Sequence, residues 1–414
     1  MSAEPGLAAP ARTGPARTAW RPVALLVAGQ GASTVGDGCY AVALPWYVLA
    51  GRGAASTLGI TLAAYGVARA AAMPAGGLLS DRLGPRRVLL AADALRALLL
   101  AVMAAAAASG PARLMILAPV AALIGAGNGV FTPGSYALVP RLVDGGLQRA
   151  NAMLTGATQV GALLGPVTGA ALVAGIGPAS AFAVDAATFA VSALTLTLIR
   201  EGAPAEAGPE GPRVSLRSVL ACSPALRTML TVVLAGNVAA AGIVTVALPV
   251  LARGHYGAGG YGLVLAALAA GAVGGTMLGA AARTSRPSVF ASLAFLVQAG
   301  ALAVIPYGGG LAAAAAAAVL FGLANSIGEL VIVTAVQRVI APAALGRVMA
   351  LIMLASAGAY PVSVGFVTFV IRHLGAAAAF PVAAGLSAAA IGWGLSRPSF
   401  RDFGRVQSGS SGGD

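Results

Sequence analysis

The stretch Gly77-Gly-Leu-Leu-Ser-Asp-Arg-Leu-Gly-Pro-Arg-Arg87 places one carboxylate and three guanidinium groups between two long apolar runs. Gly84 permits a tight turn in its middle, because glycine adopts backbone conformations that other residues avoid. Gly77 is expected to let a neighbouring helix approach closely, and Asp81 can accept hydrogen bonds from the N-terminus of a helix. The stretch therefore predicts a short connection between two membrane-spanning helices, which we name the charged loop.

The composition around this loop is that of a polytopic membrane protein. Of the 414 residues, 58% are hydrophobic and only 9% are charged, and the mean hydropathy is +0.89. A water-soluble core cannot bury that much apolar surface. Apolar runs of about 20 residues, long enough to cross a bilayer, recur along almost the whole chain.

Twelve such runs predict twelve transmembrane helices and an all-α fold. Six precede a polar stretch rich in Pro, Gly and Glu, and six follow it. We expect a cytoplasmic N-terminal tail at 1–21, a six-helix bundle at 22–200, a cytoplasmic linker at 201–224, a second bundle at 225–397 and a tail at 398–414. The predicted helices span 23–49, 57–80, 86–108, 113–139, 150–174, 179–199, 227–251, 260–283, 287–306, 311–338, 347–371 and 376–396.

An internal repeat indicates that the two halves are related by pseudo-symmetry. Val42-Ala-Leu-Pro45 in the first predicted helix recurs as Val246-Ala-Leu-Pro249 in the seventh. Between the fourth and tenth helices a constant offset pairs Asn128 with Asn325 and Arg141 with Arg338. The second copy of the charged loop has Arg283 where the first has its aspartate, so only the first copy can act as described.

Arginine placement predicts the orientation. The net charge is +13, and all 25 basic residues are arginine. In a soluble protein this charge would suggest nucleic acid as a partner, but here it lies mostly on one side of the expected membrane. Because positive residues gather on the cytoplasmic side, we expect no nucleic acid, and we place both termini in the cytoplasm together with Arg82, Arg86 and Arg87 of the charged loop. The arginines expected elsewhere are Arg52, Arg113, Arg253 and Arg372 outside and Arg69 and Arg96 within the spans.

Read as G-x-L-x-D-R-x-G-x-R, the charged loop resembles the loop between the second and third helices of major facilitator superfamily transporters. Pro85 stands where that family usually has a basic residue. The segments 132–135, 139–144 and 182–185 resemble its macrolide-efflux and enterobactin-exporter branch. The resemblance implies two pseudo-symmetric six-helix bundles around a central cavity. Arginine without lysine, with abundant Ala, Gly and Pro, is typical of a high-GC bacterium, so we expect a bacterial inner membrane.

A pattern in the fifth predicted helix resembles the G-x-x-x-G-P-x-x-G motif found mainly in exporters of this superfamily. Its residues are Gly161, Gly165, Pro166 and Gly169. The glycines are expected to let this helix pack closely against its partner in the other half, and the proline makes a bend by removing a backbone hydrogen bond. The alternative is generic packing of small residues.

Ionisable residues at membrane depth are few, and each is costly unless it has a partner or a task. Asp37 and Arg69 lie near the middle of the first two spans and can reach each other, either as a static pair or in proton coupling. Asp93 and Arg96, three residues apart on one helix face, predict a structural pair. Asp185 lies on a helix that the family places at the periphery, and we expect it to be structural.

Glu329 is the leading candidate for proton binding. It lies in the tenth predicted helix, which lines the central cavity in this fold, and no arginine lies at its depth in the C-terminal half. The charged form of an unpaired carboxyl is disfavoured there, so proton binding and release can alternate. A protonated structural glutamate is the alternative. Asn128, Asn237 and Asn325 are candidate cavity-lining groups.

A cytoplasmic gate is expected where the charged loop meets the second half. When that side is closed, the Asp81 carboxylate is expected to sit against the N-terminus of the eleventh helix, with Arg347 as its basic neighbour.

Together these features predict a proton-coupled exporter of an amphipathic small molecule such as a drug, antibiotic or secondary metabolite, acting as a monomer in the lipid bilayer. No nucleotide-binding loop is present, so the proton gradient is expected to supply the energy without a cofactor. The alternatives are a narrow-specificity siderophore exporter, an importer, and a non-transporting membrane sensor or partner-binding protein. Enzyme activity is least favoured, because no catalytic residues and no metal spacing of His, Cys and Asp are recognised.

Overall fold

The computed structural model describes residues 20–50, 54–143, 146–199, 223–282, 284–340 and 342–404. Within these ranges the regular structure is entirely helical. Nearly all of the predicted N-terminal tail and linker, and the residues after 404, lie outside them.

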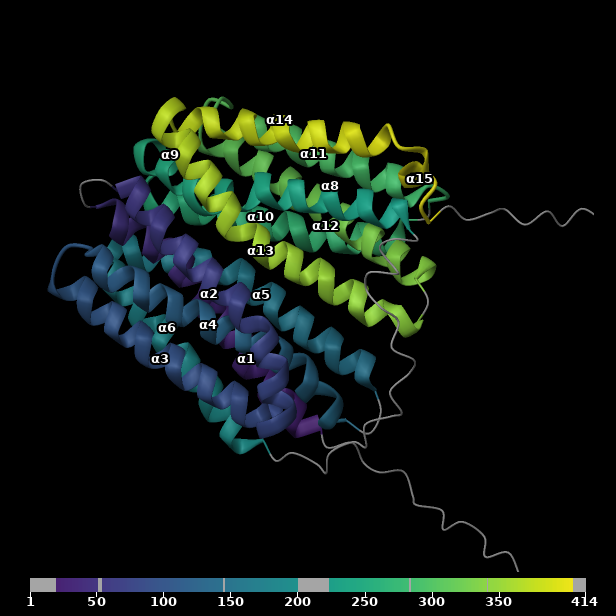
Figure 1. Cartoon of the computed structure of the whole chain (residues 1–414). Helices are drawn as coiled ribbons and strands as arrows, with labels where there is room; N and C mark the ends of the chain where they lie inside the picture. The colour runs from purple at the N-terminus through teal and green to yellow at the C-terminus, as the bar shows by residue number, and fades with distance from the viewer. Residues whose placement is uncertain are drawn as a thin grey trace, which may run out of the picture.

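Two bundles lie side by side (Figure 1). The N-terminal bundle consists of α1 (Trp20–Leu49), α2 (Ala54–Leu83), α3 (Pro85–Ser109), α4 (Leu114–Leu138), the 3₁₀ turn η1 (Val139–Arg141), α5 (Leu147–Gly175) and α6 (Pro178–Leu198). The C-terminal bundle consists of α8 (Pro224–Gly242), the π-helical turn η2 (Ile243–Ala247), α9 (Leu248–His255), α10 (Gly257–Ala281), α11 (Pro287–Val304), α12 (Leu311–Val339), α13 (Pro342–Leu374), α14 (Ala376–Leu395) and α15 (Pro398–Arg401). The predicted ends lie within a few residues of these, and α8, η2 and α9 together form the seventh predicted span.

Eleven segments of the described residues are long and apolar enough to cross a membrane. The helix α1 is not among them although it has 30 residues. Its polar side chains, among them Gln30 and Asp37, lower its hydropathy. Because α1 packs against α5 and α6 inside the bundle, it can carry more polar groups than a helix surrounded by lipid, and it completes the twelve predicted spans.

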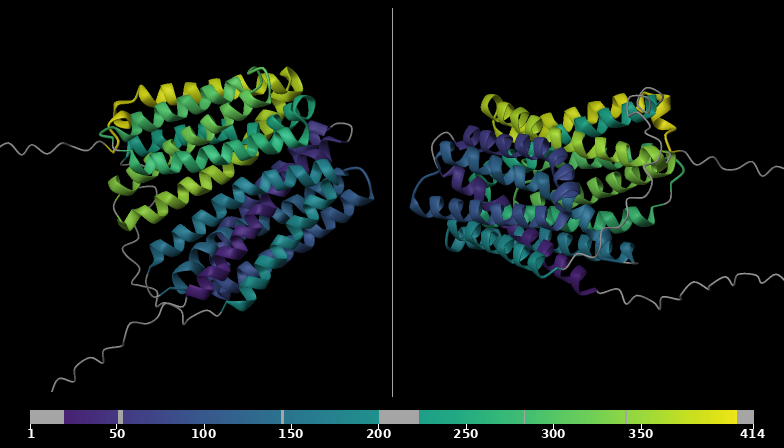
Figure 2. Two further views of the ribbon diagram at one scale, coloured as in Figure 1. Left: turned by 180° about the vertical axis from the view of Figure 1, so that it is seen from behind. Right: turned by 60° about the horizontal axis from the view of Figure 1, so that its bottom comes forward.

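Successive helices run in opposite directions, so the start of α1, the charged loop and the end of α14 lie on one face, which we name the loop face. The opposite side is the far face. Toward the far face one apolar core continues across both bundles and includes Leu44 of α1 and Val367 of α13. Toward the loop face the core divides into two clusters, one in each bundle. Figures 1 and 2 accordingly show the bundles in contact near α9 and apart at the other end. The structure is closed at the far face and open at the loop face.

Aromatic contacts close the far face. Trp46 of α1 stacks on Tyr261 of α10 with ring centroids 5.5 Å apart. The Tyr261 hydroxyl donates to the backbone oxygen of Ala41 at 3.3 Å, which links the two bundles directly. Tyr65 of α2 meets Tyr360 of α13 edge-on at 6.2 Å. Sequence reasoning had not identified these aromatic pairs, because partners in different bundles share no local spacing.

Candidate functional site

A cavity of about 200 Å³ lies inside the C-terminal bundle, between α8, α11, α12, α13 and α14. Most of its wall is apolar, as is usual for sites that bind small organic molecules. The polar side chains that line it are Asn237, Gln298, Asn325, Glu329, Ser356 and Ser387. Three of these, Asn237, Asn325 and Glu329, are candidates that the sequence had singled out separately.

Helix geometry explains why Glu329 shares this cavity with its neighbours. Asn325 and Glu329 are four residues apart on α12 and therefore lie on one face of the helix. Asn237 reaches the same cavity from α8, where its side-chain amide also donates to the Val233 oxygen at 2.9 Å. The Glu329 side chain is exposed, and among the described residues no ion pair or hydrogen bond to its carboxylate is found. A carboxylate open to water but surrounded by apolar walls can exchange a proton or bind a cationic group.

The remaining polar side chains of the cavity were missed in the sequence. Gln298 stands within the apolar run of α11, and Ser356 and Ser387 stand within α13 and α14. A glutamine inside a span is a signal that could have been used, because polar side chains at membrane depth are costly. A lone serine inside a span carries little signal, because its hydroxyl can bond to its own helix.

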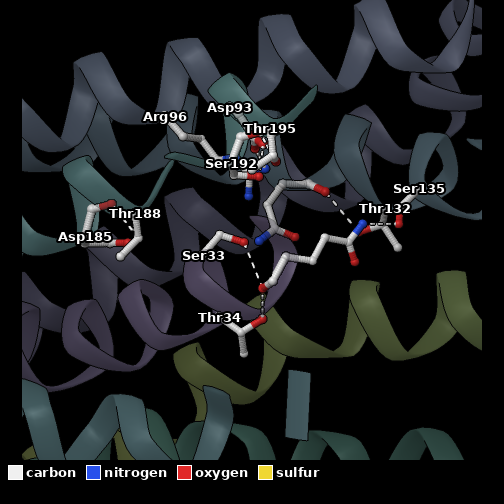
Figure 3. Close-up of polar contacts among 12 residues, drawn as sticks. Ser33, Thr34, Asp93, Arg96, Thr132, Ser135, Asp185, Thr188, Ser192 and Thr195 are labelled. Carbon is white, nitrogen blue, oxygen red and sulfur yellow. Dashed lines mark hydrogen bonds and ion pairs between the residues drawn. The ribbon is translucent and has the colours of Figure 1, made fainter. Parts of the chain in front are cut away.

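The N-terminal bundle holds a different arrangement, in which charges compensate one another (Figure 3). Asp93 and Arg96 form the predicted ion pair on α3. Ser192 of α6 donates to the second oxygen of Asp93 at 2.6 Å. The Arg96 guanidinium also lies over the rings of Phe131 and Phe189, 4.5 and 4.2 Å from their centroids. Asp93 and Arg96 are buried, so this group fastens α3, α4 and α6 together.

Asp37 and Arg69 do not pair directly. Among the described residues no ion pair joins them. The Asp37 side chain is exposed in the middle of α1, whereas the Nε atom of Arg69 is buried and without a hydrogen-bond partner. The helix α1 contacts helices of both bundles.

Asp185, expected to be structural, is buried within the N-terminal bundle. Its side chain is 1% exposed and lies on α6 against Gly36 of α1. A Cβ added at Gly36 would lie 2.3 Å from the Asp185 Oδ1 atom and 2.1 Å from the Thr188 hydroxyl oxygen. Only a residue without a side chain lets α1 and α6 approach this closely.

The comparisons with known proteins agree with this two-bundle fold. The sequence profile described as Major Facilitator Superfamily matches residues 26–364. The chain belongs to the major facilitator superfamily. No curated protein sequence matches it.

Several solved superfamily structures resemble this chain. The nucleoside transporter NupG is 11% identical with a TM-score of 0.72, and the match covers 91% of this chain and 98% of NupG. A bacterial homologue of the human lysosomal transporter Spinster, in an inward-facing and unoccupied conformation, is 14% identical with a TM-score of 0.68 over 95% of this chain and 100% of its own. A POT family transporter in complex with 5-aminolevulinic acid is 14% identical with a TM-score of 0.70, over 91% and 96% respectively. At these identities the likeness shows the transporter fold alone.

Within this transporter fold, the glycines of the exporter-like motif have a different partner from the expected one. The α5 glycines pack against α1 of their own bundle, which holds for Gly161, Gly165 and Gly169. A Cβ added at Gly165 would lie 2.6 Å from the Val35 oxygen. The contact of α5 with the other bundle lies beside this face, where a Cβ on Gly262 of α10 would lie 2.6 Å from the Pro166 oxygen. The motif thus joins α5 to α1 on one side, while Pro166 touches the second bundle on the other.

The charged loop of this superfamily member is a single-residue turn. Gly84, with φ 86°, separates α2 from α3, so the predicted turn is formed by a conformation that glycine adopts readily. A Cβ at Gly77 would have nothing within 4 Å, whereas one at Gly76 would lie 2.7 Å from the Val130 oxygen. The close approach of a helix expected at Gly77 therefore occurs one residue earlier, against α4.

The charges of this loop take different positions. Arg86 donates from Nε to the Leu196 oxygen and from a terminal nitrogen to the Thr197 oxygen, each at 2.7 Å, and so caps α6. Asp81 and Arg82 are exposed. The side chain of Arg347 lies outside the described residues, so the predicted gate contact stays a prediction.

Asn128 does not join the cavity of the C-terminal bundle. It lies on α4, where its backbone oxygen accepts from the Thr132 hydroxyl at 3.0 Å. Nearby, Gln30 of α1 donates to the Ser135 hydroxyl at 2.6 Å, a polar link between α1 and α4 that the sequence had not suggested. Among the described residues no group of three His, Cys, Asp or Glu is placed to hold a metal ion.

Proposed function

We propose that this protein is a proton-coupled exporter of an amphipathic small molecule, with Glu329 as the group that alternates between protonated and ionised states. The observation that carries the proposal is the cavity in which Glu329 stands without a partner among the described residues, surrounded by apolar walls and amide side chains. Apolar surface favours the body of an amphipathic cargo, and the amides can orient its polar groups.

Glu329 can exchange a proton for cargo because its ionised form is stable only while the cavity is open to water. While the carboxylate is ionised and open to water, it can attract a polar or positive group of the cargo. Protonation removes that attraction and makes it easier to close the low-dielectric cavity. Binding of the proton and binding of the cargo then favour different states of the transporter, which is the requirement for coupling them.

One proton supplies enough energy for export. A proton that moves down about 150 mV releases roughly 3.5 kcal/mol, which sustains a gradient of several hundred-fold for a neutral cargo. A single carboxylate in the C-terminal bundle therefore meets the energetic need.

The direction of transport rests on orientation and on the α5 motif. With the loop face in the cytoplasm, as the arginine distribution favours, the open loop face admits cargo from inside the cell. We place the protein in a bacterial inner membrane as a monomer, with both termini cytoplasmic, and assign it to the macrolide-efflux and enterobactin-exporter branch by motif resemblance. A narrow siderophore exporter, an importer and a non-transporting sensor are the outcomes to be excluded.

The decisive experiment measures efflux of a panel of amphipathic dyes and antibiotics from a pump-deficient host. The wild-type protein should lower dye retention in energised cells, and a protonophore should abolish the effect. Glu329→Gln should abolish uphill efflux while sparing downhill exchange in proteoliposomes. The matched variant Asp37→Asn should mainly reduce folding or yield.

Each result that contradicts the proposal points to a specific alternative. Increased dye accumulation would indicate an importer, and efflux of siderophores alone would indicate a narrow exporter. If Glu329→Gln still drives uphill efflux that a protonophore collapses, the proton travels elsewhere, and Asp37 becomes the leading candidate. No transport of any compound would favour the sensor.

A further inference from the structure

Asp185 combines three features that a purely structural carboxylate does not need. It is 1% exposed at the middle of α6, and its Oδ1 atom has no hydrogen-bond partner among the described residues. The same oxygen points at the backbone of α1 where Gly36 leaves room for it. An ionised carboxylate that is buried without a cation or a full set of hydrogen bonds is strongly disfavoured, so burial of this kind favours the neutral acid.

The groups around Asp185 offer no free cation. From α3 it faces Arg96, but that guanidinium is bound to Asp93 and lies over two phenyl rings. Asp37, Cys39 and Tyr40 of α1 lie within electrostatic range of it. From α2 the Tyr65 hydroxyl lies within electrostatic range. Among the described residues the guanidinium that acts on Asp185 is therefore already paired, Asp37 adds a like charge, and Arg69 of α2 acts on Asp37.

Thr188 of α6 and Tyr40 of α1 are two polar side chains near this carboxyl. The Thr188 hydroxyl lies beside it and donates to the backbone oxygen of Asp185 at 2.7 Å (Figure 3). The Tyr40 hydroxyl is buried without a hydrogen-bond partner, one turn beyond Gly36. Neither can neutralise an ionised carboxylate, but a neutral carboxyl can remain among them.

A path to water begins at the next residue of α1. Asp185 lies on α6 against Gly36 of α1, and Asp37, the next residue of α1, has an exposed side chain. Like-charge repulsion disfavours both groups being ionised together, which makes their proton binding interdependent.

We infer that Asp185 is a second proton-binding site, reached from the opening between the bundles through Asp37. In the exchange step the O–H bond of the Asp185 acid breaks and its proton passes to the Asp37 carboxylate. Asp185 then carries the single negative charge of the pair until Asp37, having exchanged its proton with water, returns one to it, so the two carboxylates are not ionised together. The inference adds a site in the N-terminal bundle to the proposed proton coupling, and it can fail while the role of Glu329 stands.

The test uses infrared spectroscopy of the purified full-length protein in lipid nanodiscs, in H₂O and in D₂O at neutral pH. A protonated carboxylic acid gives a carbonyl band that shifts on deuteration. Asp185→Asn should remove one component of this band, and Glu329→Gln should leave that component in place. Asp37→Asn should keep the component but slow its deuterium exchange about a hundredfold, the lower end of what a positioned acid–base group contributes to proton transfer.

Two outcomes overturn the inference. If Asp185→Asn leaves the band unchanged, Asp185 is ionised and holds no proton. If Asp37→Asn leaves the exchange rate unchanged, the path through Asp37 is wrong. Should Asp185→Asn fail to fold, Thr188→Val keeps the carboxyl but removes its neighbouring hydroxyl. The Asp185 component must then shift in frequency, and an unshifted band would also refute the assignment. Efflux that does not depend on protons would refute the proposed function without touching these spectra.

Discussion

The helices α1 and α8 start from the same repeated sequence but are used differently. In the register set by Val42–Pro45 and Val246–Pro249, Gly38 of α1 corresponds to Gly242 of α8. Each meets the backbone of the equivalent helix in its own bundle: a Cβ at Gly38 would lie 2.6 Å from Gly165 of α5, and one at Gly242 would lie 2.5 Å from Ser363 of α13. At this level the two halves are alike.

The difference lies on the neighbouring face of each helix. At two positions α1 has glycines, Gly29 and Gly36, whose Cβ atoms would meet α6 at less than 2.5 Å. In the same register α8 has Val233 and Ala240, and both line the cavity that contains Glu329. Glycine lets α1 lie close against α6 in the N-terminal bundle, whereas larger side chains at the equivalent positions of α8 line a cavity.

The largest effect should come from breaking the compensated pair. Asp93→Ala leaves Arg96 buried without its carboxylate, which should cost about 3–5 kcal/mol of unfolding free energy. Glu329→Ala should cost far less, because its carboxylate has no partner to lose among the described residues. Denaturant-induced unfolding in detergent, followed by tryptophan fluorescence, measures both.

A double variant separates charge compensation from packing. Asp93→Ala combined with Arg96→Leu should recover most of the loss, since an apolar replacement of a buried pair is often neutral. Equal destabilisation by Asp93→Ala and Glu329→Ala would remove the contrast between the bundles.

A smaller effect is expected from the glycine contacts. Gly165→Ala forces a methyl group against the Val35 oxygen, and overpacking of this kind costs about 1–3 kcal/mol. The matched controls are Gly156→Ala on the same helix and Gly236→Ala on α8, where a Cβ would have nothing within 4 Å. Thermal unfolding should distinguish the first variant from the other two. Similar melting temperatures for all three would show that α1 and α5 are not packed more tightly than α8 and its neighbours.

Most of the fold could be predicted from the sequence because hydrophobic length decides it. Runs such as 287–306 end at prolines and arginines that a bilayer core does not accept. The exception, α1, shows the limit: its polar residues are tolerated because it is surrounded by other helices. The turn at Gly84 was also predictable, because it depends on one residue and its direct neighbours.

The candidate site was only partly predictable. Asn325 and Glu329 share a helix face, so their proximity follows from spacing alone. The partners of Gly165 and Asp185 depend on which helix lies beside α5 or α6, and no local pattern carries that information. Resemblance to a motif indicated close packing correctly but assigned it to the wrong helix.

Substitution of Asp81 tests whether a specific contact stabilises a closed loop face, as the aromatic contacts do at the far face. In this structure its side chain is exposed, so Asp81→Asn should leave the melting temperature unchanged. If the carboxylate docks on the N-terminus of α13 when the loop face closes, the substitution should favour the open state by about 1–2 kcal/mol. Spin labels at the loop-face ends of α2 and α13 report the populations by their distance distribution. An unchanged distance distribution would contradict the docking of Asp81 on α13.

The smallest predicted effect concerns the bond by which α1 holds the other bundle. Tyr261→Phe removes the hydroxyl that donates to Ala41 but keeps the ring that stacks on Trp46. A single hydrogen bond contributes about 0.5–1.5 kcal/mol, and this one exists only while the far face is closed. The substitution should therefore shift the population toward a far-face-open state, opposite in direction to Asp81→Asn. Spin labels at the far-face ends of α1 and α10 measure the shift, and Tyr307→Phe, at an exposed tyrosine near the far face, is the control. If both tyrosine variants behave alike, the hydrogen bond from Tyr261 to Ala41 does not stabilise the closed far face, and apolar contact holds the bundles together there.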